Sequence, residues 1–270
     1  MVASGGDERL LGLLTEAIAS QAPVVMATVV STKRSVPRRS GTKMLVYEDG
    51  TQEGTVGGGA MESRVVSAAG DSIRTGKTQL LTFSLLEPER GDPGVCGGMV
   101  DIYLEPYMPA HTVFVVGAGH IGRAVVDLAS WLGYQTVITD DRKDRVSEEA
   151  MPDADVRHHG TVAEALVAHK VTENTSVVLV SRDYAIDVDA VPQLLGTSAR
   201  YLGVMGSERR WQTVRKELLA AGVDETSLDR IHNPVGIELN AETIEEIAVS
   251  ILSEVIQVTR GSIAEQPDDD

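Results

Sequence analysis

The chain has 270 residues, 42% of them hydrophobic, and a formal net charge of −16 at pH 7. The length allows one large domain or two ordinary ones, while the acidic balance argues against a nucleic-acid-binding protein, which needs a basic surface. The single cysteine excludes an internal disulfide framework, and we find neither a signal peptide nor an apolar stretch near the ~18–20 residues of a membrane span, so we expect a cytoplasmic protein outside the membrane.

The first 108 residues predict a compact α+β domain. A helix is expected over residues 8–20, where Leu10, Leu14 and Ala17 fall on one face. The other expected elements are strands over 24–31, 43–47, 51–56, 79–85 and 99–105 and a helix over 60–75. Five basic residues that fall between positions 33 and 43 indicate either a locally held anion or a solvated loop; they are Lys33, Arg34, Arg38, Arg39 and Lys43.

Two prolines, Pro106 and Pro109, mark the boundary to a second domain, which we place at 109–262. Strands expected near 113–116, 135–139, 176–181 and 200–204 alternate with helices, which predicts a parallel sheet covered on both faces. A last helix is expected over 241–258, capped by Asn240, and then a disordered acidic tail over 263–270. The predicted fold class is therefore α/β, with a Rossmann-like, doubly wound parallel sheet preceded by a smaller α+β domain.

The start of the second domain is typical of a dinucleotide-binding β-α-β unit. An apolar strand leads into GAGHIG at 117–122, and the next strand ends on Asp140. In this pattern Gly117 makes the tight turn, Gly119 lets a diphosphate approach the backbone, and Gly122 lets helix and strand pack closely. Asp140 is placed to bond ribose hydroxyls, which favours NAD over NADP because a 2′-phosphate would be repelled. The alternative is that the glycines serve only packing.

Further glycine-rich segments are candidate binding sites. Gly57-Gly58-Gly59 precede a helix, leaving the backbone open for an oxyanion or phosphate, and Glu62 in the first turn either caps that helix or bonds a ligand. Cys96-Gly97-Gly98 place a thiol in a loop mouth, where it could be a nucleophile or a soft metal ligand rather than an inert buried residue. Gly206-Ser207 follow the last strand, and we expect them, with His232, to face the same crevice as the Gly117 loop.

These motifs together resemble the XdhC/CoxI family, accessory proteins of molybdenum hydroxylases such as xanthine dehydrogenase. The similarity runs from about residue 10 to residue 260. The matching N-terminal motifs are Ser35-Val36-Pro37-Arg38, Gly41, Gly57-Gly58-Gly59 with Glu62, and Cys96-Gly97-Gly98. The matching C-terminal motifs are Gly117-Ala118-Gly119-His120, Asp140-Asp141-Arg142 and the stretches 201–207, 232–236 and 245–248. Two positions depart from the family: Arg34 stands in place of a glycine, and Ser181-Arg182-Asp183 replace Thr-His-Asp.

The resemblance implies a carrier or chaperone rather than an enzyme. It would bind molybdenum cofactor, as molybdopterin or its cytosine dinucleotide, help its sulfuration and deliver it to an apo molybdenum hydroxylase. Arg38 and the Gly57 turn would hold phosphate and pterin, Cys96 would lend a thiolate toward molybdenum or pass on sulfur, and the Rossmann unit would bind the nucleotide part or a separate NAD(P). A cysteine desulfurase is a further expected partner, and a homodimer is expected. The alternatives are an NAD-dependent oxidoreductase and a nucleotide-sensing regulatory module.

Overall fold

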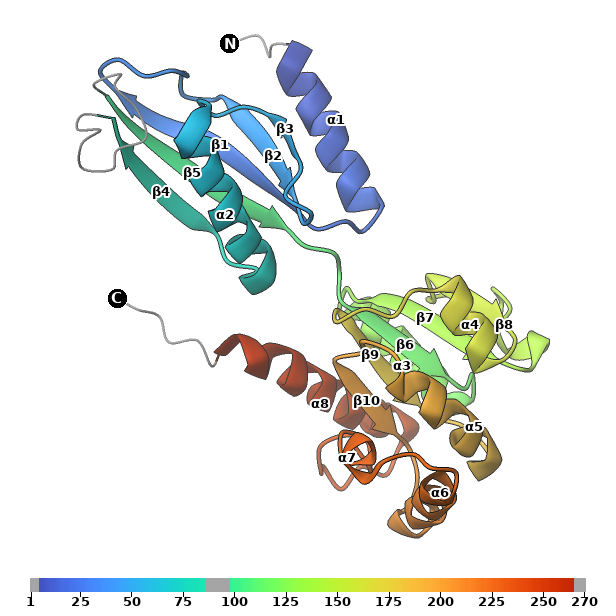
Figure 1. Ribbon diagram of the computed structural model, residues 1–270. Helices are drawn as coiled ribbons and strands as arrows, with labels where there is room; N and C mark the ends of the chain where they lie inside the picture. The colour runs from blue at the N-terminus through green and yellow to red at the C-terminus, as the bar shows by residue number, and fades with distance from the viewer. Residues whose placement is uncertain (1–4, 86–97, 265–270) are drawn as a thin grey trace. The chain divides into compact units, whose positions relative to one another are not determined.

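The computed structural model describes residues 5–85 and 98–264, and the chain divides into two compact units, Met1–Pro109 and Ala110–Asp270 (Figure 1). The division falls at the proline-containing break in the sequence. The predicted fold class is confirmed, because an α+β unit precedes a unit with a parallel five-stranded sheet. Within the described residues no helix is both long and apolar enough to cross a lipid bilayer.

The N-terminal unit is an antiparallel sheet with one helix on each face. The strand order is β3-β2-β1-β5-β4, so the long central strand β1 pairs with both β2 and β5. Its elements are α1 (Gly5–Ala19), β1 (Val24–Lys33), β2 (Lys43–Tyr47), β3 (Gln52–Gly54), α2 (Gly59–Thr75), β4 (Gln79–Ser84) and β5 (Met99–Tyr107).

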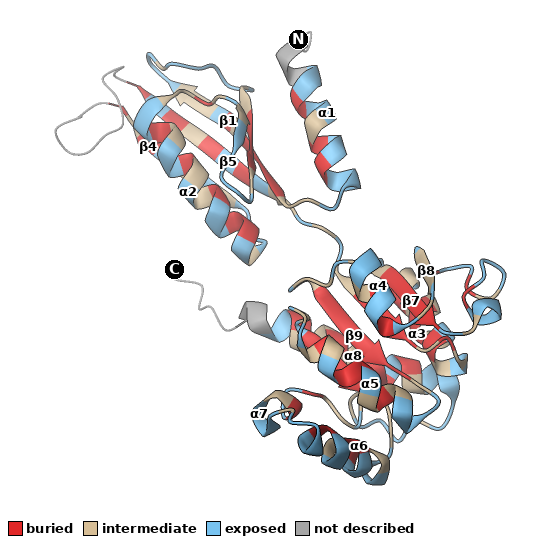
Figure 2. Ribbon diagram, turned by 45° about the vertical axis from the view of Figure 1, so that its right-hand side comes forward, coloured by how far each residue is buried: buried red, intermediate tan, exposed pale blue. Residues whose placement is uncertain are grey.

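Alternation along β1 explains the two helix layers. Val25 and Ala27 point to the α2 side, where they join a core with Met61 and Val65 of that helix. Met26 points to the other side, into a core with the apolar stripe of α1. Figure 2 shows the resulting buried stripes along α1 and α2. A strand buried on both faces must be apolar throughout, as β1 is over most of its length.

The C-terminal unit is a doubly wound parallel sheet with the strand order β10-β9-β6-β7-β8. Its strands are β6 (Thr112–Val116), β7 (Gln135–Asp140), β8 (Val156–His159), β9 (Thr175–Leu179) and β10 (Tyr201–Val204). The sequence analysis missed β8, because its four residues, VRHH, lack the apolar run by which the other strands were found. As β8 is an edge strand and only partly buried, apolar patterning does not reveal it.

Helices cover both faces of this sheet, as predicted. Val113 and Val115 of β6 face a core shared with α3 and α8, whereas Phe114 and Val116 face a core shared with α4, α5 and α6. The helices are α3 (His120–Trp131), α4 (Val162–Ala168), α5 (Tyr184–Leu195), α6 (Glu208–Ala220), α7 (Glu225–Leu228) and α8 (Ile244–Ala264). Since α3 leaves β6 on one face and α5 leaves β9 on the other, the chain reverses between these two neighbouring strands, and such switch points open a ligand crevice.

The last helix differs from the prediction. It begins at Ile244 rather than at residue 241, and Asn240, with φ of 52°, is not its cap. Instead the hydroxyl of Thr243 accepts the N–H of Glu246, whose carboxylate accepts the N–H groups of Thr243 and Glu242. This reciprocal capping box is the stronger start signal. The helix runs to Ala264, and the rest of the tail predicted over 263–270 lies outside the described residues.

The close packing of the glycine loop predicts a specific loss of stability. A Cβ at Gly122 would overlap the carbonyl oxygen of Gly117, whereas one at Gly119 meets no atom within 4 Å. We expect Gly122→Ala to lower the free energy of unfolding by about 1–3 kcal/mol, and the matched Gly119→Ala to change it by less than about 0.5 kcal/mol. Tryptophan fluorescence in urea measures this unit alone, since Trp131 and Trp211 both lie in it. Equal losses in the two variants would contradict the packing role of Gly122.

Candidate functional site

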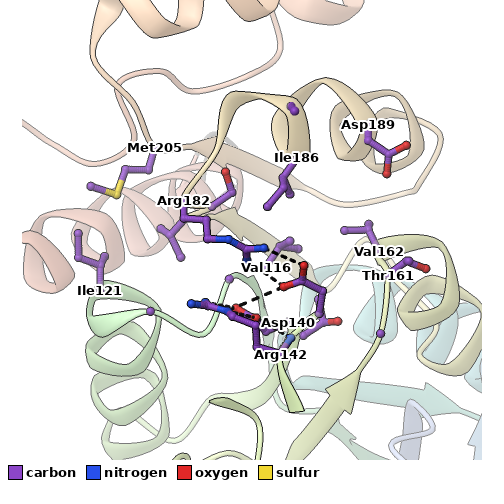
Figure 3. Close-up of a pocket in the computed structure, with 18 of the residues that line it drawn as sticks. Val116, Ile121, Asp140, Arg142, Thr161, Val162, Arg182, Ile186, Asp189 and Met205 are labelled. Atoms are coloured by element: carbon purple, nitrogen blue, oxygen red, sulfur yellow. Dashed lines mark hydrogen bonds and ion pairs between the residues drawn. The ribbon is translucent and has the colours of Figure 1, made fainter. Parts of the chain in front are cut away.

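A cavity of about 600 Å³ lies at the carboxyl edge of the parallel sheet (Figure 3). The carboxyl ends of β6 and β7 border it, and so do the residues that follow β8, β9 and β10. Its size suits a nucleotide or a similar small molecule. Four of the predicted site residues line this cavity: Gly117, Gly119, His120 and Asp140.

The loop after β6 has the geometry of a diphosphate cradle. Gly117 has a φ of 110°, and a Cβ there would lie 2.6 Å from the carbonyl oxygen of Val180, so only glycine fits. Gly119 has open space around it and is the N-cap of α3, with no side chain bonding the first N–H groups of that helix. Because these N–H groups are unpaired and the helix dipole favours negative charge, the loop can accept an anion.

Asp140 is held by the protein itself. One carboxylate oxygen accepts the Ala118 N–H at 2.7 Å and Nη2 of Arg142 at 2.8 Å, and the other accepts the N–H and Nε of Arg142 at 3.0 and 2.8 Å. Its side chain is 2% exposed. Burial by itself would raise the pKa of Asp140, but the bonds from Arg142 and Ala118 outweigh burial and hold the pKa well below its ordinary value. Asp140 is therefore charged and ties the glycine loop to the end of β7.

A second ion pair crosses the cavity. Arg182, which follows β9, donates from Nη1 and Nη2 to the two carboxylate oxygens of Asp141, each at 2.8 Å. Figure 3 shows Arg182 reaching from one side of the crevice toward the end of β7, above the Asp140–Arg142 pair. Both partners are about half exposed. This pair contributes little to stability but places a second guanidinium at the ligand site.

Apolar walls flank the two ion pairs. Figure 3 shows Val162 and Ile186 on one side of them and Ile121 and Met205 on the other. Thr139 also lines the cavity, and its hydroxyl is buried with no hydrogen-bond partner among the described residues. An unpaired buried hydroxyl is costly, so a ligand that bonds it would relieve that cost. The cavity thus combines apolar surface with a few polar groups, as ligand pockets do.

The loop after β10 lies beside a second, smaller cavity of about 430 Å³. Ser207 lines it and caps α6 by accepting the Arg210 N–H, while Gly206 is not part of either wall. Arg210 is bound to the carboxylate of Asp187, which is 1% exposed. Burial raises the pKa of Asp187 above its ordinary value in spite of the bonds from Ser181 and Arg210. Arg182 belongs to both cavities, so it connects the two sites.

His232 is not among the residues that line either cavity. Its Nδ1 lies 2.8 Å from the carboxylate of Glu254 in α8, and its ring contacts Tyr201, whose hydroxyl donates to the same carboxylate at 2.6 Å. Burial and the neighbouring carboxylate raise the pKa of Tyr201. His232 was expected to face the crevice, and its backbone does pair with Gly203 near the carboxyl end of β10, but its side chain is held against Glu254 and Tyr201 instead.

The glycine turn in the N-terminal unit already holds a carboxylate. Oε1 of Glu62 accepts the hydroxyl of Thr55 and the N–H groups of Val56, Gly57 and Gly58, the last at 2.9 Å. Burial would raise the pKa of Glu62, yet these bonds outweigh it and keep the pKa below its ordinary value. The turn thus has the geometry of an anion-binding nest, and its occupant in this structure is the chain's own side chain.

Three predicted motifs of the N-terminal unit meet at one place. A Cβ at Gly98 would overlap the carbonyl oxygen of Ser35, and one at Gly57 would lie 3.6 Å from Pro37. The loop that carries Arg38 therefore contacts both the Gly57 turn and Gly98, and the Arg38 side chain is exposed. Cys96 and Gly97, the other two residues of that motif, lie outside the described residues. Among the described residues no group of three or more His, Cys, Asp or Glu side chains could hold a metal ion.

The sequence analysis missed several residues of the larger cavity. Arg142 belongs to the Asp140-Asp141-Arg142 motif and Arg182 to a departure from the family pattern, but the sequence predicts neither as a binding residue. Gly160 and Thr161 were missed together with β8, and Thr139 carries no motif. The sequence could have indicated Arg142, because a residue two positions after the acid at the end of β7 faces the same crevice as that acid.

Comparison with known proteins shows to which family the chain belongs. A sequence model of the XdhC Rossmann domain matches residues 113–255, which is more than half of the chain, and a model of the XdhC and CoxI family matches residues 17–84. The chain belongs to the XdhC and CoxI family. Both units are covered, so the family relationship includes the Gly57 turn as well as the nucleotide-type cavity.

Proteins similar to this XdhC-family chain include the following three. YqeB of Escherichia coli is 30% identical, over 87% of this chain and 43% of its own length. A protein of Bacillus subtilis named as a probable xanthine dehydrogenase subunit is 26% identical, over 61% of this chain and 47% of its own length. The molybdenum cofactor insertion chaperone PaoD of E. coli is 23% identical, over 92% of this chain and 87% of its own length. The chain spans less than half the length of the first two.

A solved structure shows that the fold is shared. It is described as a xanthine dehydrogenase from Bacillus halodurans, is 22% identical, and covers 96% of this chain and 98% of its own with a TM-score of 0.52. The relation extends over both units of this XdhC-family chain.

The buried charge of Asp140 predicts a pH-dependent stability. Because its folded-state pKa is depressed, its contribution is present above the ordinary value of 3.8 and is lost as pH falls through the folded-state pKa. We expect Asp140→Asn to lower the free energy of unfolding by about 2–3 kcal/mol at pH 7, below the full cost of breaking a buried pair because Arg142 stays partly hydrated. The difference in the free energy of unfolding between the wild type and Asp140→Asn should become smaller below about pH 4. Urea unfolding followed by tryptophan fluorescence measures this difference. A difference that stays constant down to pH 3 would contradict the depressed pKa of Asp140.

The Glu62 nest predicts an anion effect. Glu62→Ala leaves the N–H groups of Val56 and Gly58 unpaired, and the Gly57 N–H keeps only the Thr55 hydroxyl at 3.3 Å. We therefore expect a loss of about 1–3 kcal/mol in the N-terminal unit, partly recovered by inorganic phosphate entering the nest. The exposed Glu48→Gln is the matched control and should respond to phosphate as the wild type does. Scanning calorimetry with and without phosphate measures both effects. A phosphate response no larger in Glu62→Ala than in the wild type would show that the nest does not bind free anions.

Proposed function

We propose that this chain binds molybdenum cofactor, supports its sulfuration and delivers it to an apo molybdenum hydroxylase of the xanthine dehydrogenase type. The observation that carries the proposal is the meeting of three segments in the N-terminal unit that resemble motifs of the family: the loop of Arg38, the Gly57 turn and Gly98. Family membership supports it, and so do the names of two relatives, one a cofactor insertion chaperone and the other a xanthine dehydrogenase subunit.

The chemistry of the N-terminal cluster suits an anionic cargo. The loop of residues 33–43 carries Arg34, Arg38 and Arg39 with exposed side chains, in a protein whose net charge is strongly negative. Guanidinium groups bind phosphate bidentately, and the Gly57 nest can accept a phosphate oxygen when Glu62 moves aside. Cys96 precedes Gly98 by two residues in the sequence, and its thiol is the group that we assign to contact with molybdenum or to transfer of sulfur.

The C-terminal cavity supplies a site for a nucleotide. Its glycine loop and unpaired helix N-terminus suit a diphosphate, and its apolar walls suit a base. The ligand there is either the nucleotide part of a cytosine dinucleotide form of the cofactor or a separate NAD(P). Sulfuration would require a sulfur donor such as a cysteine desulfurase, and a homodimer would present the cargo to its target symmetrically.

Equilibrium titration with anaerobically prepared molybdenum cofactor tests the proposal on the full chain. We expect tight binding by the wild type, at least a tenfold loss in Cys96→Ala with no change in thermal stability, and no effect of Cys96→Ala on nucleotide binding in the other unit. Gly119→Ala is the complementary variant for the nucleotide site of the C-terminal unit, because its added methyl enters the space that we assign to a diphosphate. A wild type that does not bind the cofactor would refute the proposal, and unchanged binding by Cys96→Ala would remove Cys96 from the mechanism.

The same titrations separate the alternatives. Substrate-dependent turnover of NADH would indicate an oxidoreductase. Nucleotide binding without affinity for molybdenum cofactor would indicate a regulatory module that senses a nucleotide.

A further inference from the structure

The acid at the end of β7 cannot bind a ribose as the structure stands. Both oxygens of Asp140 are engaged, each by two N–H donors, and the side chain is 2% exposed. Releasing it would uncouple the glycine loop from Arg142 and expose a buried charge. The preference for NAD over NADP that the sequence indicates depends on a free carboxylate at this position, and that carboxylate is neutralised by Arg142.

The neighbouring carboxylate lies between two guanidinium groups. Asp141 is bound by both terminal nitrogens of Arg182 at 2.8 Å, and one of its oxygens lies 3.9 Å from Nε of Arg142. The Asp141 side chain is 54% exposed, whereas Asp140 is buried. An exposed anion therefore stands between two arginines that line the cavity.

From this geometry we propose that the C-terminal cavity takes a 2′-phosphorylated dinucleotide of the NADP(H) type, with Arg142 and Arg182 binding the 2′-phosphate in place of Asp141. The inference rests on the nucleotide site of the proposed function and names its ligand. In dinucleotide-binding folds, the residues after the second strand meet the ribose, and an arginine there accommodates a 2′-phosphate. Arg142 occupies that position here, and Arg182 reaches it from β9.

Charge and exposure favour this exchange. A phosphate monoester carries close to two negative charges at neutral pH and offers three acceptor oxygens, against one charge and two oxygens for Asp141. Two arginines suit such a group because each can donate two parallel N–H bonds. An exposed ion pair is weak and readily exchanged, so Asp141 can turn into solvent. Arg142 keeps its bonds to Asp140 and stays oriented toward the ligand.

The remaining parts of such a ligand also have partners. The pyrophosphate fits the loop at Gly119 and the unpaired N–H groups that begin α3. The adenine fits the apolar wall formed by Val162 and Ile186. The hydroxyl of Thr139, which lines the same cavity and has no partner among the described residues, offers the ligand a polar group. All these groups belong to the same 600 Å³ cavity.

Isothermal titration of the full chain with NADP⁺ and with NAD⁺ tests the inference. We expect NADP⁺ to bind at least tenfold more tightly than NAD⁺. Arg182→Gln should weaken NADP⁺ about tenfold and change NAD⁺ less than threefold. Asp141→Asn should strengthen NADP⁺ binding, because it removes the competing carboxylate. Arg123→Gln is the matched control: it removes the same charge from α3, outside the cavity lining, and should leave both affinities unchanged.

The opposing effects of Arg182→Gln and Asp141→Asn separate phosphate recognition from a general loss of structure. Both side chains are about half exposed, so both variants should keep the wild-type melting temperature. Equal or tighter binding of NAD⁺, or weaker NADP⁺ binding by Asp141→Asn, would overturn the inference. Binding of neither nucleotide would overturn it as well, and the separate titration with molybdenum cofactor would still decide the proposed function.

Discussion

The C-terminal unit depends on the carboxylate of Asp140. It accepts the N–H of Ala118 in the glycine loop and three N–H groups of Arg142, so the loop after β6 and the turn after β7 are fixed to each other. The arrangement requires a charged, buried acid, and the bonds that depress its pKa ensure that it stays charged at neutral pH. With the loop fixed, Gly119 and the start of α3 remain open toward the cavity, and Arg142 is directed to its rim.

The N-terminal unit uses a similar device for a different purpose. Glu62 fills the nest of backbone N–H groups at the Gly57 turn, which satisfies donors that would otherwise be unpaired. An internal carboxylate in an anion nest keeps the turn ordered without a ligand, and an incoming phosphate must compete with it. The two units thus differ: the glycine loop at the start of α3 has no side chain bonding its N–H groups, whereas the nest of the N-terminal unit is occupied by the chain's own Glu62.

Two arginines give the larger cavity its chemical character. Arg142 is anchored by a buried acid and Arg182 by an exposed one, so the first is fixed and the second is exchangeable. Arg182 stands where the family pattern has a histidine, and it borders both cavities of the unit. Arg182 therefore supplies a permanent positive charge to the larger cavity of this chain.

The sequence by itself determined the two-part architecture, most strand positions and the glycine loop, because apolar alternation and obligatory glycines are local properties. It also led to the family, whose models match both units. Only the tertiary structure decided which charges are free. Asp140 and Glu62 look like ligand-binding acids in the sequence, yet both are bound by N–H groups of their own unit. His232 was expected in the crevice but pairs with Glu254 of α8, and β8 was missed. The physical reason is that a side chain's hydrogen-bond partners come from distant segments, whose approach no local pattern records.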